Sequence, residues 1–198
     1  MGLRRNKRLI SLSRPGLLAA AEQKSLRADP KSPLAERKNP RRIIIGIDPG
    51  LASTGWGVIE SSRSRLRYIA HGCIETKPDE DRGGRLVHIY KSFLKVLKTY
   101  KPGEAAIENL YFGKNISSAM TVAEARGVLL IAICDHGSPA LELTPNAIKK
   151  AVVGVTKADK QQIQEMVRLL LGLSEIPKPD HAADALAAAI CAAHQVTI

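Results

Sequence analysis

Hydrophobic residues recur along the chain in short β-branched runs and in longer stretches with helical spacing. The apolar run over residues 43–47 stops at Asp48, which precedes a proline and a glycine, so it predicts a buried strand that ends on a carboxylate. Runs over residues 55–60 and 66–72 flank a polar linker and predict an antiparallel hairpin. Two more short strands are predicted over residues 104–108 and 141–143.

Helical spacing predicts the remaining elements. Apolar residues repeat at intervals of three and four over residues 86–97, and this helix is expected to end before Lys101. A helix over 117–135 should end at Gly137, and Thr144 should cap a short helix after it. Thr156 and Asp159 should form the capping box of the next helix. An Ala-rich helix should cover 181–195, with Asp180 as its N-cap. Strands followed by alternating helices and strands predict an α/β fold, a mixed five-stranded sheet with helices on both faces.

Charge divides the chain into two parts. Residues 1–42 carry 12 basic and 3 acidic residues, a net charge of +9 out of +11 for the 198-residue chain. This basic extension has four prolines and little apolar periodicity, so we predict that it is disordered. Three roles stay open for it: an arm that grips nucleic acid, an organelle-targeting segment, or a leader without a role. Residues 43–195 are enough for one folded domain of ordinary size.

Composition excludes some classes of protein. No apolar run approaches the roughly 18 residues that span a membrane, so we expect no membrane insertion. The three cysteines, Cys73, Cys134 and Cys191, are odd in number and far apart, which predicts buried thiols in a reducing compartment rather than disulfides or a zinc site. A cytoplasmic location is therefore expected.

Acidic side chains follow two of the predicted strands. Asp48 and Glu108 each close an apolar strand, and His181 and Asp184 lie one turn apart on the last helix, where they share a face. If the two strands are neighbours and the helix crosses them, the four groups converge. Ligands of this kind suit Mg²⁺ or Mn²⁺, and two such ions would activate a water and stabilise the leaving oxygen in a phosphodiester displacement.

Each of these residues also has a purely structural interpretation. Asp48 before Pro-Gly is typical of a turn, His181 fits a surface position, and Asp184 favours the positive end of a helix. Glu108 is harder to explain in this way, because a carboxylate rarely closes an apolar strand without a partner.

Several motifs together resemble the crossover junction endodeoxyribonuclease RuvC family in order and spacing. They are Ile45-Gly46-Ile47-Asp48-Pro49-Gly50, Thr54-Gly55 with Gly57, Ala106-Ile107-Glu108, Ala125-Arg126-Gly127, Val152-Val153-Gly154 and His181-Ala182-Ala183-Asp184-Ala185-Leu186-Ala187, spread over residues 43–194. The resemblance implies an RNase H-like nuclease domain, a homodimer, and Mg²⁺-dependent resolution of four-way (Holliday) DNA junctions by paired symmetric nicks in recombination and repair. Asp48, Glu108, His181 and Asp184 match the family's metal-binding tetrad. The family often has Asp where this chain has His181, and whether His181 is a metal ligand or a general base stays open.

The family also places basic residues beside the scissile phosphate and an aromatic residue just after the second acid. By position, Lys149 and Lys160 match the former and Tyr111 the latter, whereas Lys114 and Arg126 are weaker candidates for DNA contact. Judged from the residues alone, either lysine fits a solvated helix face equally well, and Tyr111 fits ordinary core packing. The RuvA and RuvB branch-migration proteins are partners by resemblance only.

Two functions of other classes compete with this one. Asp48-Pro49-Gly50 with Thr54-Gly55 is also similar to the phosphate-binding hairpin of actin/Hsp70-type ATP-binding proteins, but these need a second lobe that a single domain of this size does not supply. A non-catalytic DNA-binding module explains the basic charge, but it does not explain carboxylates at strand ends, which repel phosphate unless a cation lies between. The preferred cleavage sequence and the physiological metal stay open.

Overall fold

The computed structural model describes residues 41–63, 65–109 and 116–195. Its elements in chain order are β1 (Arg42–Asp48), β2 (Ser53–Ser62), β3 (Arg65–Glu75), α1 (Arg82–Tyr100), β4 (Glu104–Glu108), α2 (Ile116–His136), β5 (Ala140–Leu143), α3 (Pro145–Val153), α4 (Lys160–Leu171) and α5 (Asp180–His194). We predict disorder for the basic extension, and residues 1–40 of this extension lie outside the described ranges. Its last residue, Arg42, belongs to the fold, because β1 begins there.

The strands form one mixed sheet in the order β3-β2-β1-β4-β5, as the sequence predicts. The hairpin of β2 and β3 is antiparallel, and β2 pairs antiparallel with β1. On the other side of β1, β4 and β5 run parallel to it. The carboxyl ends of β1 and β4 therefore lie next to each other at one edge of the sheet.

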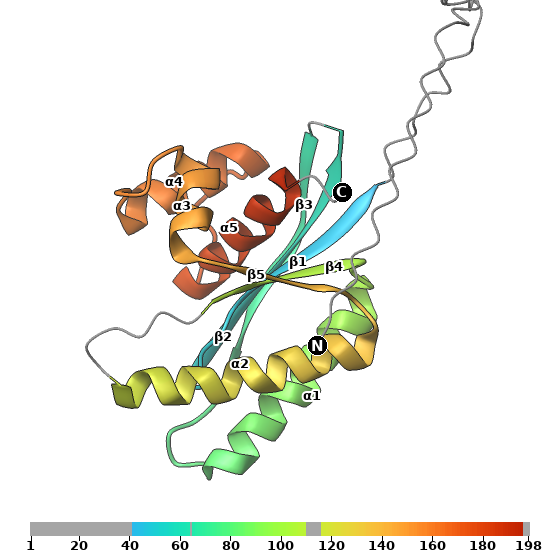
Figure 1. The fold of residues 1–198 in the computed structure, drawn as a ribbon, viewed down its shortest axis with the longest axis vertical. Helices are drawn as coiled ribbons and strands as arrows, with labels where there is room; N and C mark the ends of the chain where they lie inside the picture. The colour runs from blue at the N-terminus through green and yellow to red at the C-terminus, as the bar shows by residue number, and fades with distance from the viewer. Residues whose placement is uncertain (1–40, 64, 110–115, 196–198) are drawn as a thin grey trace, which may run out of the picture. The chain divides into compact units, whose positions relative to one another are not determined.

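Helices cover both faces of this sheet (Figure 1). Alternate residues of β1 point to opposite faces, so Ile44 joins a core with α3, α4 and α5, whereas Ile45 and Ile47 join a second core with α1 and α2. Each core is built from β-branched strand residues and from the apolar stripe of the facing helices. The fold class that the sequence predicts is confirmed.

Helix α5 packs directly on β1 and β2, and two glycines make this possible. A Cβ atom placed on Gly46 would lie 1.9 Å from the carbonyl oxygen of Ala185, and one placed on Gly55 would lie 1.9 Å from that of His181. Both positions exclude a side chain, since real Cβ atoms do not approach backbone this closely. The alanine side chains of α5 are also buried against the sheet.

Two predicted helix starts are wrong. The capping box of α4 consists of Asp159 and Gln162, not of Thr156 and Asp159, and Ala158 is 4% exposed in the core just before it. Packing of Ala158 brings the chain onto the core before the helix begins, so Thr156 remains in the preceding turn. Helix α5 has Pro179 as its N-cap without a side-chain hydrogen bond, so Asp180 is the first residue of the helix and not its cap. The predicted cap of α3 is correct, because Thr144 accepts from the backbone N–H of Ala147.

The cysteines are only partly as expected. Cys191 is buried, Cys73 is half-buried and Cys134 is exposed. The prediction of buried thiols is therefore wrong for Cys134, which lies on a face of α2 that the sheet does not cover. In the described part of the chain, no helix is both long and apolar enough to cross a membrane.

Candidate metal centre

The two strand-end acids lie at the same edge of the sheet. Strands β1 and β4 pair in parallel register, with Ile47 opposite Ile107, so Asp48 and Glu108 follow at the ends of adjacent strands. The buried isoleucines fix the register, because a slip by one residue would move them to the wrong face. The structure thus brings together the two carboxylates that the strand pattern singles out.

The first turn of α5 adds two further groups. His181 and Asp184 face the strand ends, and the imidazole Nδ1 of His181 lies 2.7 Å from the Oδ2 atom of Asp48. Ligand atoms of Asp48, His181 and Asp184 all lie within 4.8 Å of one another, close enough to hold one metal ion. The close approach depends on Gly55, which pairs with Asp48 in the sheet and contacts the backbone of His181.

Glu108 stands beside this group of three rather than in it. Its pKa is nevertheless raised to about 7, first because burial disfavours the charged form, and then because of the charges of Asp48 and Asp184. Burial and the charge of Asp48 also raise the pKa of Asp184. The hydrogen bond with Asp48 raises the pKa of His181. These carboxylates are crowded together with too little positive charge between them.

This donor set fits a divalent cation. Carboxylate oxygens with one imidazole nitrogen are ligands that Mg²⁺ or Mn²⁺ accepts, and a cation would relieve the repulsion by Asp48 and Asp184 that adds to burial in raising the pKa of Glu108. The fit rests on the chemistry of the donors and on their proximity.

Both lysines that the sequence singles out lie beside the acids. Glu108, Lys149, Lys160 and Asp184 line one cavity of about 240 Å³. The Lys160 ammonium lies 3.0 Å from a carboxylate oxygen of Asp180 and 3.6 Å from one of Asp184. Lys149 acts on Glu108 through its charge, which partly opposes the rise in the pKa of that carboxyl.

The other candidates for DNA contact have different outcomes. Tyr111 and Lys114 lie outside the described residues. Arg126 forms an ion pair with Glu142 of β5, and its side chain is 15% exposed, so it ties α2 to the sheet edge. Asp180, which the sequence assigns to the cap of the last helix and not to the metal ligands, pairs with Lys160 beside these acids.

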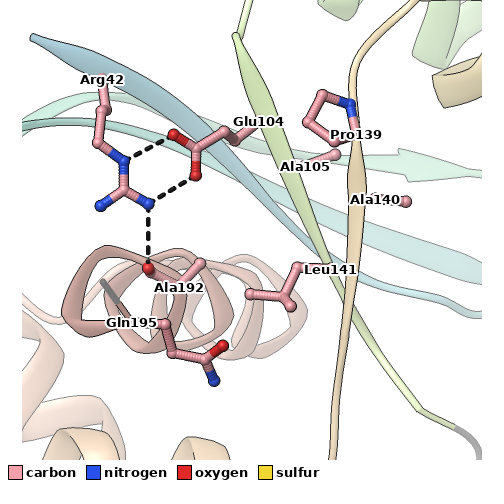
Figure 2. A pocket seen from close by; sticks show the side chains of 8 residues that line it. All are labelled: Arg42, Glu104, Ala105, Pro139, Ala140, Leu141, Ala192 and Gln195. Carbon is pink, nitrogen blue, oxygen red and sulfur yellow. Dashed lines mark hydrogen bonds and ion pairs between the residues drawn. The ribbon is translucent and has the colours of Figure 1, made fainter. Parts of the chain in front are cut away.

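A second cavity lies at the opposite end of β1. It has a volume of about 270 Å³ and is lined mainly by small apolar side chains around Arg42 (Figure 2). The Arg42 guanidinium donates to both carboxylate oxygens of Glu104 and to the carbonyl oxygens of Ala192 and Ala193. These contacts join β1 and β4 to the end of α5, so the guanidinium has a structural role at this end of the sheet.

A mixed sheet with acids at the ends of two parallel neighbours, crossed by a helix that supplies further ligands, defines an RNase H-like nuclease. Residues 44–192 match the family model described as crossover junction endodeoxyribonuclease RuvC. The chain belongs to the RuvC family.

Similar proteins and solved structures support this assignment. The RuvC of Treponema denticola is 53% identical over 156 residues, which cover 79% of this chain and 88% of that protein. The RuvC of Heliobacterium modesticaldum is 46% identical over 155 residues, covering 78% and 96%. The structure of Thermus thermophilus RuvC in complex with a Holliday junction substrate is 34% identical, with a TM-score of 0.72 over 76% of this chain and 92% of that chain. A yeast mitochondrial Holliday junction resolvase, 12% identical over 80% of this chain and 82% of that chain, shares the fold with a TM-score of 0.58.

The family confirms the resemblance seen in the sequence, together with the RNase H-like fold and the endonuclease class. The ATP-binding and the non-catalytic DNA-binding alternatives are thereby set aside.

Proposed function

We propose that this chain resolves four-way DNA junctions, in recombination and repair, by metal-assisted hydrolysis of two symmetrically placed phosphodiester bonds. The observation that carries the proposal is the convergence of Asp48, His181 and Asp184 within 4.8 Å, with Glu108 beside them. On their own these carboxylates would repel the DNA backbone, so a site of this kind acts on phosphate only with cations between. Membership of the RuvC family supplies the substrate.

We propose that Asp48, Glu108, His181 and Asp184 hold two Mg²⁺ ions, and that Mn²⁺ substitutes for them. Such a pair of ions activates the attacking water and stabilises the leaving oxygen. The charge of Asp48 raises the pKa of both Glu108 and Asp184, so Asp48 would hold a cation together with either of them. His181 can serve as a ligand only through an unprotonated nitrogen; a neutral ring that donates its Nδ1–H to Asp48 keeps Nε2 unprotonated for this purpose.

Lys149 and Lys160 are the proposed contacts to the scissile phosphate. Their support is the cavity that they share with Glu108 and Asp184, because a phosphate held there would meet the acids and the ammonium groups together. Tyr111, three residues after Glu108, is proposed to stack on an unpaired base at the junction centre.

A homodimer would supply the second active site that paired nicks require. Helix α2 supports this proposal, since Met120 and Ile131 are each 57% exposed and lie about three turns apart on one face. Gly127 and Cys134 lie on the same stripe, and a Cβ atom at Gly127 would meet nothing within 4 Å. A stripe of small and apolar side chains lets two helices pack closely, and it would bury the exposed thiol of Cys134.

The remaining assignments rest on charge and family alone. We propose that the extension over residues 1–40, with its net charge of +7, is an arm that grips DNA. A cytoplasmic location and cooperation with RuvA and RuvB are proposed from the family.

The test is cleavage of a synthetic four-way junction, labelled on each strand, in Mg²⁺ and in EDTA, with a linear duplex of the same sequence as control. Paired nicks on the junction alone, dependent on Mg²⁺, are expected. Asp48→Asn should bind the junction with unchanged or higher affinity and not cleave it, because it loses a metal ligand but none of the basic contacts. The exposed Glu175→Gln is the matched control and should cleave normally. Equal cleavage of the linear duplex, or full activity in Asp48→Asn, would refute the proposal.

A further inference from the structure

Asp180 begins α5 but does not cap it. The N-cap position belongs to Pro179, and no side-chain hydrogen bond caps the helix within the described part of the chain. An aspartate next to such a helix start normally satisfies the free N–H groups of the first turn. The Asp180 carboxylate instead lies 3.0 Å from the ammonium of Lys160.

Lys160 extends from a fixed base. It is the first residue of α4, within the capping box that Asp159 forms with Gln162, and it lies two residues after the buried Ala158. The backbone is therefore held in place, and only the four-carbon side chain can move. At its end the ammonium lies between two carboxylates of α5, with Asp180 at 3.0 Å and Asp184 at 3.6 Å.

The two carboxylates have different roles. Asp180 and Asp184 are four residues apart and share one helix face, so one ammonium reaches both. Asp184 is a member of the group that can hold a metal ion, whereas Asp180 is not. If the Lys160 ammonium paired only with Asp184, it would compete with a divalent cation for the same oxygen atoms. If it had no carboxylate partner at all, it would have no preferred position beside the site.

We propose that Asp180 is a positioning residue that tethers the Lys160 ammonium at the rim of the metal centre, closer to Asp180 than to Asp184, so that the ammonium competes less with a cation for Asp184 and stays within reach of the phosphate. This inference rests on the proposed function of the site. It assigns Asp180 no contact with metal or DNA; Asp180 acts through Lys160. The pKa of Asp180 is lowered chiefly by its hydrogen bond with Lys160, which agrees with this contact.

Removing the tether should weaken cation binding. In Asp180→Asn the ammonium loses its nearer partner and settles on Asp184, so the affinity for Mn²⁺ should fall by about two- to fivefold, the range expected for one exposed ion pair. In a Lys160→Gln background no competing ammonium exists. There, the same Asp180→Asn change should leave the affinity for Mn²⁺ unchanged within error.

The measurement is Mn²⁺ binding to the full chain without DNA, by titration calorimetry or by electron paramagnetic resonance of the free ion, for the four proteins of this double-mutant cycle. Glu175→Gln, an exposed acid five residues before Asp180, controls for a general loss of negative charge and should bind as wild type does. Junction cleavage over a Mg²⁺ series gives a second readout. Asp180→Asn should need a higher Mg²⁺ concentration for half-maximal rate, and conservative Asp180→Glu should restore the wild-type requirement.

Two failures can be told apart. Asp48→Asn should abolish Mn²⁺ binding; if it does not, the metal centre itself is wrongly assigned. If it does, but Asp180→Asn weakens binding equally with and without Lys160, then Asp180 acts only as one more negative charge and the tether is refuted. Unchanged binding in the single variant Asp180→Asn would refute it as well.

Discussion

Replacing Glu108 with glutamine should stabilise the metal-free protein, and the gain should depend on pH. The side chain keeps its shape and loses its ionisable proton. In the fold the pKa of Glu108 is raised to about 7, whereas its ordinary value is 4.5. Between these two values the folded protein holds a proton that the unfolded chain has already released. The free energy of unfolding therefore falls as pH rises from about 4.5 to 7, and above pH 7 the whole of this loss in stability is present.

The size of the effect follows from the two pKa values. Each tenfold change in proton affinity is worth about 1.4 kcal/mol, so the interval from 4.5 to about 7 corresponds to at most about 3 kcal/mol. Glutamine carries no charge at any pH. Glu108→Gln should therefore match the wild type near pH 4 and exceed its stability by about 2–3 kcal/mol at about pH 8.

Urea unfolding in EDTA, followed by circular dichroism at intervals from about pH 4 to about pH 8.5, measures this difference. Glu175→Gln is the control, because it makes the same substitution at an exposed position outside the site. Adding Mg²⁺ at about pH 8 should stabilise the wild type more than Glu108→Gln, since a cation neutralises the carboxylates that the variant has in part lost. A difference between variant and wild type that does not change with pH, or a variant that is less stable than the wild type in alkaline buffer, would show that Glu108 is not held in the crowded, charged environment described above.

Other substitutions test separate features. Gly55→Ala should cost about 1–3 kcal/mol in urea unfolding and reduce cleavage, because its Cβ atom would force His181 away from the sheet, whereas Gly103→Ala, which meets nothing within 4 Å, should do neither. Wild-type cleavage should fall towards acid pH, since metal binding needs a neutral imidazole and the hydrogen bond with Asp48 raises the pKa of His181, and His181→Asp should keep its activity to lower pH; identical acid limbs would show that His181 is not the group that sets this limb. Ile131→Glu should sediment as a monomer and lose paired nicking, and an unchanged dimer would place the interface elsewhere. Deleting residues 1–40, which spares the contact between Arg42 and Glu104, should leave cleavage intact and make junction binding less salt-dependent, by about 0.9 in slope for each phosphate that the arm neutralises in the full-length protein; an unchanged slope would exclude a DNA arm.

Local sequence was sufficient for most elements. Strand β1 and its terminal carboxylate follow from a β-branched run before Asp48-Pro49, and Thr144 caps α3 as its position before Pro145 predicts. These features depend on neighbours within a few residues, where backbone preferences act directly. The local pattern predicted the wrong cap for α4, where Thr156 and Asp159 are both possible N-caps. Asp159 is the N-cap because the buried Ala158 packs on the core just before it.

Local patterns along the chain predict which side chains end the strands and which share a face of the last helix, and the resemblance of its motifs to one family indicates what they do. The tertiary structure is needed to make β1 and β4 neighbours and to bring α5 close enough on Gly46 and Gly55 for His181 to reach Asp48. It alone decided that Glu108 has a pKa of about 7 and that Asp180 binds Lys160 instead of capping its helix. Burial and charge act through space between residues far apart in the chain, so no local pattern carries them.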